Sequence, residues 1–225
     1  MLIITDIGIP EGLALRNPLQ TELGRNIIKH SVELIDEIGF EAFTFKKLAT
    51  KMGSNETSLY RYFENKHLLL LYLVVWYWNW ISYLIDYNTK NITDPVQKLK
   101  IILDNFVDAP KGNPSVDFVN ESKLHKIIIS ESSKAYHTKD VDTENKSGFF
   151  LSYKGMIKKV AEVINEIDPK FPYPHSFASN LFEMVSNQIY FAEHLPRLTD
   201  VKIKKDNYEE VRKLLDFYVQ KMLGV

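Results

Sequence analysis

Residues 44–69 read TFKKLATKMGSNETSLYRYFENKHLL. This stretch contains two short segments of helical character, residues 45–52 and 56–63. Gly53 lies between them, and glycine adopts positive φ at little cost, which suits the corner of a tight turn. Ala49 lies four residues earlier, where two crossing helices need a small side chain. The stretch therefore predicts a helix-turn-helix.

The second segment exposes side chains that are suited to DNA. Thr44 and Asn55 can cap the two segments, because their side chains accept hydrogen bonds from otherwise unpaired amides. Leu48, Met52 and Leu59 fall on the inner faces, which leaves the polar residues of the second segment outside. Five of these can form hydrogen bonds to base edges or to phosphates: Asn55, Glu56, Thr57, Ser58 and Arg61.

The stretch resembles the N-terminal signature of the tetracycline-repressor (TetR) family of transcriptional regulators. The preceding residues 39–44, GFEAFT, are also similar to the family's link between its first two helices. The rest of the chain resembles the family only in length and helix content. The positions that match in register are Thr44, Leu48-Ala49, Gly53, Leu59-Tyr60, Tyr62-Phe63, Lys66 and Leu69.

The resemblance implies that this region binds DNA as the family does. Thr44, at a helix N-terminus, would hold a phosphate with its hydroxyl and the adjacent amides. Leu59 and Phe63 would be core residues. Bases in the major groove would face the start of the second helix: Asn55, Glu56, Thr57 and Ser58. Phosphates would face the hydroxyls of Tyr60 and Tyr62 and the ammonium of Lys66, with Lys46 and Lys47 adding positive charge nearby.

Simpler interpretations exist for several of these residues. Tyr60 and Tyr62 also fit aromatic side chains at the edge of a core, and the three lysines also fit a solvated face. Glu56 departs from the family, which usually has no acid at this position. Its carboxylate can accept a hydrogen bond from a cytosine amine or can cap the N-terminus of the helix. The capping interpretation is preferred.

The charge balance argues against tight DNA binding. The chain has 28 basic and 29 acidic residues, a net charge of −1. Residues 20–70 contain seven basic and seven acidic residues, whereas residues 44–66 contain five basic and two acidic ones, a net charge of +3. Because the neutralisation of phosphates supplies much of the affinity for DNA, we expect modest binding with a weak salt dependence.

The rest of the 225 residues predicts an all-α protein of about nine helices. The expected domains are an N-terminal arm (1–19), a helix-turn-helix domain (20–66) and a larger helical domain for ligand sensing and dimerisation (67–225). Residues 110–114 predict a break, and the polar residues 138–147 predict a loop. Outside the motif, helices are expected over residues 20–38, from 66 onward, 95–107, 122–136, 149–167, 176–195 and 208–223.

Residues 68–85 form an uncharged stretch of eighteen residues, which is just long enough to span a bilayer. A buried helix is preferred, because the stretch lacks flanking basic clusters and follows the motif directly. Four aromatic residues share one face of it: Trp76, Trp80, Tyr83 and Tyr87. They fit either core packing or the wall of a pocket for a small apolar or aromatic ligand. In the TetR family this helix transmits ligand binding to the DNA-binding region.

The last two long helices have wide apolar faces. In the TetR family such a pair forms a four-helix bundle with its two-fold mate, so the resemblance implies a homodimer. Packing within a single chain is the alternative. The two faces consist of Phe177, Leu181, Met184, Val185, Gln188 and Phe191, and of Val211, Leu214, Leu215, Tyr218 and Met222.

Other classes of protein lack support in the sequence. The absence of cysteine excludes disulfides, Cys-ligated zinc, iron–sulfur clusters and a thiol nucleophile. The six histidines form no HExxH pair, and the chain has no GxSxG motif and no P-loop. We therefore expect no catalytic activity, no metal and no cofactor. Residues 1–10 lack the basic region of a signal peptide, which favours a cytoplasmic protein.

These observations predict a ligand-responsive transcriptional regulator, of the repressor type, that binds operator DNA as a homodimer. Its expected partners are double-stranded operator DNA, a small apolar or aromatic effector and a second copy of the chain. No association with a membrane is expected. The alternative is an interaction or ligand-binding protein of the same fold whose DNA-binding region is weak or lost.

Overall fold

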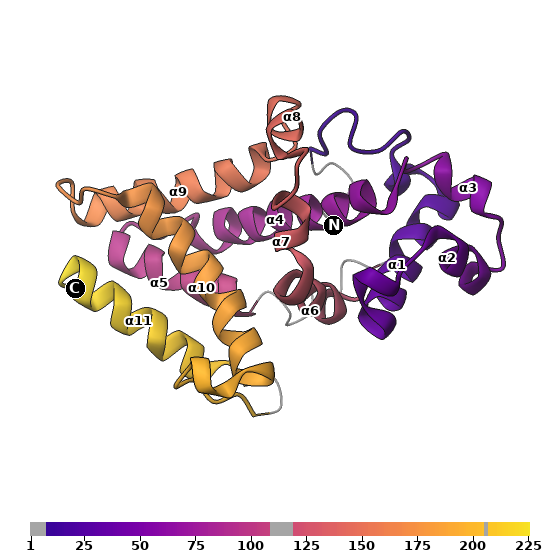
Figure 1. The fold of residues 1–225 in the computed structure, drawn as a ribbon. Coiled ribbons are helices and arrows are strands. Elements are labelled where there is room, and N and C mark those ends of the chain that lie inside the picture. Colours follow the sequence, from indigo (N-terminus) through magenta and orange to yellow (C-terminus); the bar gives the residue numbers. More distant parts are fainter. Residues whose placement is uncertain (1–7, 109–118, 205–206) are drawn as a thin grey trace. The chain divides into compact units, whose positions relative to one another are not determined.

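The computed structural model describes residues 8–108, 119–204 and 207–225. Within these ranges the chain is helical and forms no strand, apart from a single bridge between Lys204 and Asn207, so the expected all-α class is confirmed (Figure 1). The chain divides into two compact units. The first unit comprises the described residues up to Asn79 and 119–151, and the second comprises 80–108 and the described residues from Ser152 onward.

The first unit contains the helix-turn-helix together with the helices that support it. Helices α1 and α6 pack against each other, and α2 packs against both α1 and α3 (Figure 1). Its elements are a 3-10 helix (Pro18–Gln20), α1 (Glu22–Ala42), α2 (Phe45–Met52), α3 (Glu56–Tyr60), the first part of α4 (Lys66–Thr89), α6 (Glu121–Glu131), α7 (Ser133–Tyr136) and α8 (Val141–Lys146).

The N-terminal arm packs onto the helix-turn-helix. Leu13 and Leu19 are buried, and the amide of Leu15 donates a hydrogen bond to the carbonyl oxygen of Tyr62 (2.9 Å). The described part of the expected arm is therefore an integral part of the first unit. Residues 1–7 of that arm lie outside the described residues.

Helix α1 changes direction at Gly39, where the sequence predicts its end. Gly39 has a φ of 74° and a ψ of 158°, a conformation that residues with a Cβ rarely adopt. One further turn follows and ends at Ala42. The kink releases the amide of Phe40 from the helical hydrogen-bond pattern, and this amide donates to Oε1 of Glu131 in α6 (3.2 Å). The end of α1 is thus attached to α6.

Helix α4 is a core helix, as expected. Residues 69–78 are all buried, and so are Trp80, Ile81 and Ile85. The helix is long and apolar enough to cross a membrane, but 72% of its most apolar window is buried in the structure.

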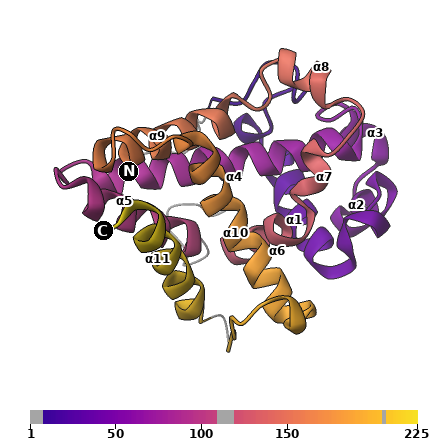
Figure 2. The same ribbon diagram turned by 60° about the vertical axis from the view of Figure 1, so that its left-hand side comes forward.

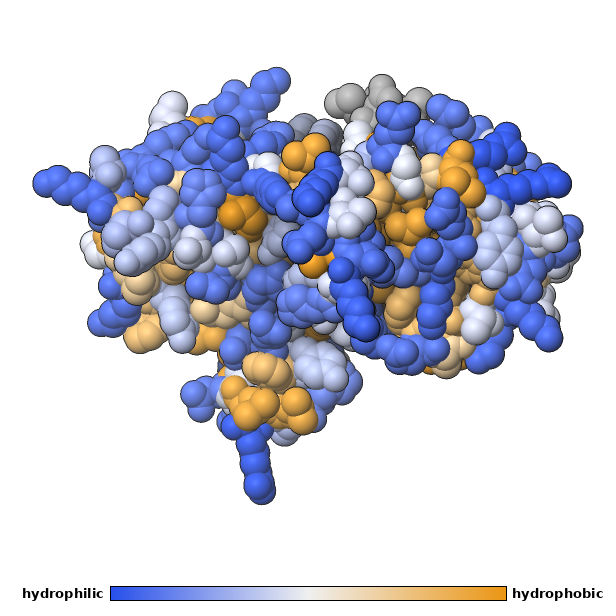
Figure 3. Space-filling view, turned by 45° about the horizontal axis from the view of Figure 1, so that its top comes forward, coloured by the Kyte–Doolittle hydropathy of each residue, from blue (hydrophilic) through white to orange (hydrophobic). Residues whose placement is uncertain are grey.

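On the face shown in Figure 3, hydrophilic residues predominate and apolar residues form separate patches.

The second unit is arranged around α5 (Pro95–Asp108). It also contains the second part of α4, α9 (Leu151–Ile167), α10 (Pro174–His194) and α11 (Glu209–Leu223). Helix α5 packs against both α10 and α11 (Figure 2). The rings of Phe106 and Phe182 meet edge to face, with their centroids 5.0 Å apart. Arg212 of α11 forms ion pairs with Asp104 (3.2 Å) and Asp108 of α5.

The expected helices are present with small shifts at their ends, and two expectations need correction. Residues 122–136 form two helices, α6 and α7, in place of one. Residues 138–147, expected as a loop, contain α8. Helices α6 to α8 belong to the same compact unit as the helix-turn-helix, and the expected domain boundary after residue 66 stays a prediction. The expected break at residues 110–114 lies outside the described residues.

A long-range contact explains α8. The sequence VDTENK is short and polar, so it carries no helical periodicity. In the structure Glu144 of α8 is buried, and its Oε1 lies 2.6 Å from Nε2 of His67 in the first turn of α4. The two residues are far apart in the sequence, and their pairing holds a segment that local signals do not identify.

Helices α4 and α6 share a buried polar pair. The hydroxyl of Tyr77 lies 2.8 Å from Nδ1 of His125, and the two ring centroids are 6.0 Å apart. Burial disfavours the charged imidazolium and lowers the pKa of His125 to about 3. His125 is therefore neutral in the folded protein at neutral pH.

We expect His125 to make the protein less stable in acid. The folded pKa is about 3 and the ordinary value is 6.5, so the unfolded chain binds more protons between these pH values. The free energy of unfolding should therefore fall as the pH is lowered through this window, by roughly 2 kcal/mol between pH 7.5 and pH 5. Urea unfolding of His125→Gln should show a correspondingly weaker pH dependence than the wild type.

His175 is exposed in the first turn of α10, so His175→Gln serves as the control and should retain the pH dependence of the wild type. An unchanged pH dependence in His125→Gln would contradict the burial of a neutral imidazole at this position.

Candidate nucleic-acid interface

Helices α2 and α3 have the local geometry of the predicted helix-turn-helix. Oγ1 of Thr44 accepts from the amide of Lys47 (3.2 Å), and Oδ1 of Asn55 accepts from the amide of Ser58 (2.9 Å), so both expected N-caps are confirmed. Gly53 ends α2 in the left-handed conformation, with a φ of 61° and a ψ of 32°. The inner faces of the motif bury Leu48, Ala49 and Leu59.

The basic side chains of the motif differ in their availability. Lys46 and Arg61 are exposed. Lys47 is also exposed, although its Nζ donates to a backbone carbonyl oxygen at the end of α1 (2.8 Å). Lys51 pairs with Glu37 (2.8 Å), and this hydrogen bond raises the pKa of the lysine and lowers that of the carboxyl. We call Lys46, Lys47 and Arg61 the exposed basic set.

The residues expected to read bases have different surroundings. Oδ1 of Asn55 accepts a second hydrogen bond, from the hydroxyl of Ser58 (2.9 Å). Thr57 is exposed. Glu56 lies in the first turn of α3, but its Oε1 accepts from the hydroxyl of Tyr60 (3.3 Å). Asn55 fills the N-cap, and Glu56 lies in the first turn of α3, where its charge favours the helix N-terminus, so the preference for this role over a contact with cytosine stays a prediction.

Tyr60 lies at the surface, where the sequence places it. Its side chain is 48% exposed, and one edge of the ring rests against the buried ring of Phe45, with the centroids 5.0 Å apart. Partial desolvation and then the neighbouring carboxylate of Glu56 raise the pKa of Tyr60. A phosphate contact through its hydroxyl stays a prediction.

Tyr62 is a core residue, which corrects the expectation that its hydroxyl faces a phosphate. It is only 2% exposed, and its hydroxyl lies 2.7 Å from the hydroxyl of Thr21. Thr21 caps α1 by accepting from the amide of Gly24 (3.0 Å). The guanidinium of Arg16 lies 5.6 Å from the centroid of the Tyr62 ring. Tyr62 therefore joins the N-terminal arm, the start of α1 and the end of the motif.

Lys66 ties α4 to the end of α1, and its expected role as a phosphate contact stays a prediction. Its Nζ donates to the carbonyl oxygens of Phe40 (3.1 Å), Glu41 (3.1 Å) and Phe43 (3.2 Å). The same atom lies 4.8 Å from the centroid of the Phe40 ring. These carbonyls follow the kink at Gly39, where helical hydrogen bonding ends. The three donors of the ammonium are thereby used.

Two residues that the sequence does not single out complete this junction. Glu131 of α6 accepts from the amide of Phe40, as described above. Lys134 of α7 lies 2.7 Å from Oε2 of Glu131 and 2.9 Å from Oε1 of Glu41. The hydrogen bond from Lys134 lowers the pKa of Glu41, and the carboxylates raise the pKa of Lys134. No sequence signal links Glu131 and Lys134 to residues 40 and 41, because the two pairs of residues are distant along the chain.

The four aromatic residues expected to line a ligand pocket belong to different units. Trp76 is buried in the first unit, whereas Trp80, Tyr83 and Tyr87 belong to the second. Trp80 stacks on Tyr83 with a centroid distance of 5.9 Å, and Tyr83 stacks on Tyr87 at 6.1 Å. Tyr87 is 67% exposed. The last three form a continuous stack along α4, and a ligand role for the four residues stays a prediction.

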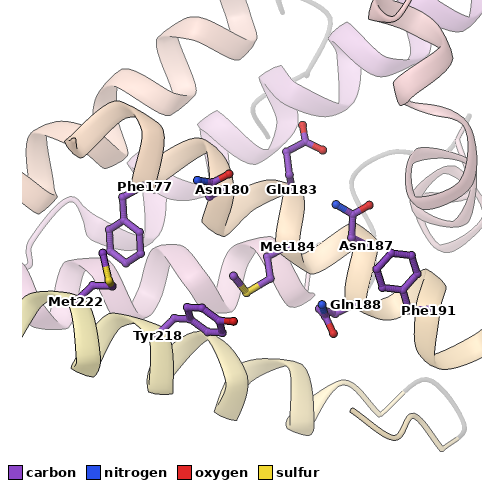
Figure 4. Close-up of a pocket in the computed structure, with 9 residues that line it drawn as sticks. All are labelled: Phe177, Asn180, Glu183, Met184, Asn187, Gln188, Phe191, Tyr218 and Met222. Carbon is purple, nitrogen blue, oxygen red and sulfur yellow. The ribbon is translucent and has the colours of Figure 1, made fainter. Parts of the chain in front are cut away.

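Two pockets in the second unit are not lined by these aromatic residues. One has a volume of about 310 Å³ and a charged rim that includes Asp86, Lys98 and Lys159. The other has a volume of about 430 Å³ and lies on α10 and α11. Figure 4 shows Met184 and Tyr218 pointing into this groove from the two helices. Its lining residues are Phe177, Asn180, Glu183, Met184, Asn187, Gln188, Phe191, Tyr218 and Met222.

The fold and the motif define a class: an all-helical protein with an N-terminal helix-turn-helix. Residues 27–73 match the family model of bacterial regulatory proteins of the tetR family. The resemblance to the TetR family is therefore confirmed on the region that contains α2 and α3. No curated protein matches the sequence.

Solved structures share the fold over most of the chain. AibR in complex with isovaleryl coenzyme A and operator DNA is 16% identical, with a TM-score of 0.58 over 88% of this chain and 98% of that one. The ketosteroid transcriptional regulator KstR2 of Mycobacterium tuberculosis is 14% identical, with a TM-score of 0.56 over 91% and 95%. The superantigen PfiT is 12% identical, with a TM-score of 0.59 over 90% and 97%. At these identities the likeness concerns the fold.

Replacement of Lys66 is expected to destabilise the first unit. Lys66→Met keeps an unbranched side chain but removes the ammonium donor from the carbonyl oxygens of residues 40, 41 and 43, at a cost of about 1–3 kcal/mol in the free energy of unfolding. The carbonyl oxygen of Phe40 retains the amide of Phe43 as a donor (3.3 Å). Lys46→Met removes an exposed ammonium from the same motif and should change this free energy by less than about 0.5 kcal/mol. Urea denaturation compares the two variants, and equal stabilities would contradict the role of Lys66.

Proposed function

We propose that the chain is a ligand-responsive transcriptional regulator, of the repressor type, that binds operator DNA as a homodimer through α2 and α3. The observation that carries this proposal is the exposed polar face of α3 beside the exposed basic set, on a motif of the TetR family. AibR, described with operator DNA and an acyl coenzyme A, and KstR2, described as a transcriptional regulator, support it through the shared fold. A cytoplasmic location agrees with this function.

The chemistry of the motif fits a DNA duplex. The exposed basic set supplies charge to phosphates, and Thr44 with the first amides of α2 provides a further phosphate contact. Asn55 uses its side-chain oxygen within the protein but keeps its amide N–H groups, which can donate to N7 or O6 of guanine. Thr57 can donate or accept a hydrogen bond. Because only a few cations are exposed, we expect modest affinity with a weak salt dependence.

The groove on α10 and α11 supports the homodimer. Phe217, Tyr218 and Met222 of α11 are exposed, and Tyr218 and Met222 line the groove together with apolar residues of α10. Exposed apolar surface of this kind is typical of interaction sites. A two-fold partner would cover it with the same surface of a second chain. A dimer also provides the two recognition helices that half-sites one helical turn apart require.

The effector is proposed to act through α4. An apolar or aromatic ligand against Trp80, Tyr83 and Tyr87 would contact a helix whose first turn contains Lys66. The end of α1 is hydrogen-bonded to Lys66 of α4 through the carbonyl oxygen of Phe40, and to Glu131 of α6 through the amide of Phe40. Displacement of either helix would therefore move the turn that precedes α2. Small shifts of this kind are sufficient to alter the spacing of two recognition helices.

A second candidate is an interaction protein of the same fold whose DNA-binding region is weak. Residues 20–70 carry equal numbers of basic and acidic residues, seven of each, which favours this reading. The fold is also shared with PfiT, which is described as a superantigen, so the fold alone does not establish that the chain binds DNA.

Binding to the DNA that flanks the protein's own gene tests the proposal. The wild type should bind a fluorescent duplex saturably and more weakly as salt is raised. Lys46→Ala should reduce the affinity for all sequences alike and lower the slope of log affinity against log salt by about one, because one phosphate contact is lost. Anisotropy titrations at several salt concentrations measure both quantities.

Lys100, exposed on α5 in the second unit, provides a control with the same change of charge, and Lys100→Ala should bind as the wild type does. Wild-type binding no stronger than to random DNA would favour the interaction protein.

The groove on α10 and α11 should control the oligomeric state. Tyr218→Glu introduces a charge into the proposed interface and should convert a dimer into a 26.2 kDa monomer. Tyr173→Glu makes the same substitution at a more exposed tyrosine that does not line the groove, and it should leave the dimer intact. Sedimentation equilibrium at micromolar concentration measures the mass, and a monomeric wild type would contradict the proposed dimer.

A further inference from the structure

Glu56 contributes an acidic side chain to α3 that is held in a defined position. Its Oε1 accepts from the hydroxyl of Tyr60 (3.3 Å), one turn later on the same helix. Tyr60 is itself positioned by its ring contact with the buried ring of Phe45. Asn55 fills the N-cap, so the capping of α3 does not require the carboxylate. Glu56 remains partly exposed beside Thr57.

The chemistry of a carboxylate limits what Glu56 can contact on DNA. An ionised carboxylate offers acceptors and no donor. Phosphates are anionic acceptors, so they repel it. In the major groove, guanine presents only acceptors, and thymine presents an acceptor and a methyl group. Hydrogen-bond donors are found only on the N4 amine of cytosine and the N6 amine of adenine.

Cytosine suits the carboxylate better than adenine does. On adenine the N6 amine lies beside N7, an acceptor that would face the second carboxylate oxygen. On the major-groove edge of cytosine the N4 amine has no acceptor beside it on the same base. A carboxylate therefore gains one hydrogen bond at cytosine and meets an opposing acceptor at every other base.

We propose that Glu56 is a specificity-determining residue that selects a cytosine in each half-site, and that Tyr60 is its positioning residue. This inference rests on the proposed DNA-binding function. The carboxylate gains a partner only at its own cytosine and is repelled by backbone phosphates on any sequence. Glu56 thus lowers the affinity for unrelated DNA and raises the discrimination between sites. A DNA-binding region with no net charge is compatible with recognition that depends on such discrimination.

The test compares the full-length wild type with Glu56→Gln and Glu64→Gln. Each protein selects duplexes from a randomised double-stranded DNA library, and the bound sequences are determined. Glutamine keeps an oxygen that can accept from Tyr60 and adds an amide donor, and glutamine pairs with both N6 and N7 of adenine. Glu64 is exposed in the turn after α3, so Glu64→Gln makes the same change of charge outside the helix.

The wild type is expected to prefer cytosine at one position of each half-site by about tenfold. Glu56→Gln should change that preference to adenine and leave the other positions unaltered, whereas Glu64→Gln should retain the cytosine. Tyr60→Phe removes the hydroxyl that holds the carboxylate and should weaken the cytosine preference without replacing it by another base.

A selective wild type whose base preferences are unchanged in Glu56→Gln would overturn the assignment of Glu56 and leave the proposed function intact. A wild type that selects no sequence would overturn both. If Glu56→Gln and Glu64→Gln raise the affinity for all duplexes equally, Glu56 acts only through its charge, and the assignment fails.

Discussion

The ammonium of Lys66 donates to carbonyl oxygens at the end of α1, and the arrangement of the helix-turn-helix depends on this contact. A helix that ends inside a protein leaves carbonyl groups that need donors. Here Lys66 donates to the carbonyl oxygens of residues 40, 41 and 43, which follow the kink at Gly39, and that of Phe40 also accepts from the amide of Phe43. The same kink frees an amide, which Glu131 accepts. The turn leading into α2 is therefore fixed by one residue from α4 and one from α6.

This junction also determines which charges are left for a partner. Lys66 and Lys51 are used within the protein, by carbonyl oxygens and by Glu37. Lys134 is used in the same way, by Glu41 and Glu131. The exposed basic set is consequently small, and the formal charge of the motif overstates its attraction for phosphates. For a region with few free cations, selectivity for a DNA sequence would depend more on hydrogen bonds between α3 and base edges than on charge, because contacts to bases carry the sequence information.

Local sequence signals predicted the elements whose causes are local. Thr44 and Asn55 cap helices, Gly39 and Gly53 adopt positive φ, and Pro95 opens α5, all as expected from residue type. These features depend on a few neighbouring residues, so a single sequence contains the information. The match of residues 27–73 to the tetR family model agrees with the motif read from the same stretch.

Features that depend on distant residues were not predictable in this way. The resemblance to the TetR family implied phosphate contacts for Tyr62 and Lys66, whereas in the structure they contact the hydroxyl of Thr21 and the carbonyl oxygens after Gly39. Helix α8 depends on the pairing of Glu144 with His67. The aromatic residues of α4 share a helical face, yet Trp76 belongs to the first unit and Trp80 to the second. Periodicity identifies a face of a helix but not what packs against it.

Hydrogen–deuterium exchange of the full-length protein, with and without a duplex recovered from the library, tests the central claim most directly. We expect slower exchange on DNA binding in peptides that cover residues 44–61, where α2 and α3 would meet the duplex, and unchanged exchange in peptides of α9. Unchanged exchange across residues 44–61, or protection confined to the second unit, would contradict the assignment of this motif as the DNA-binding surface.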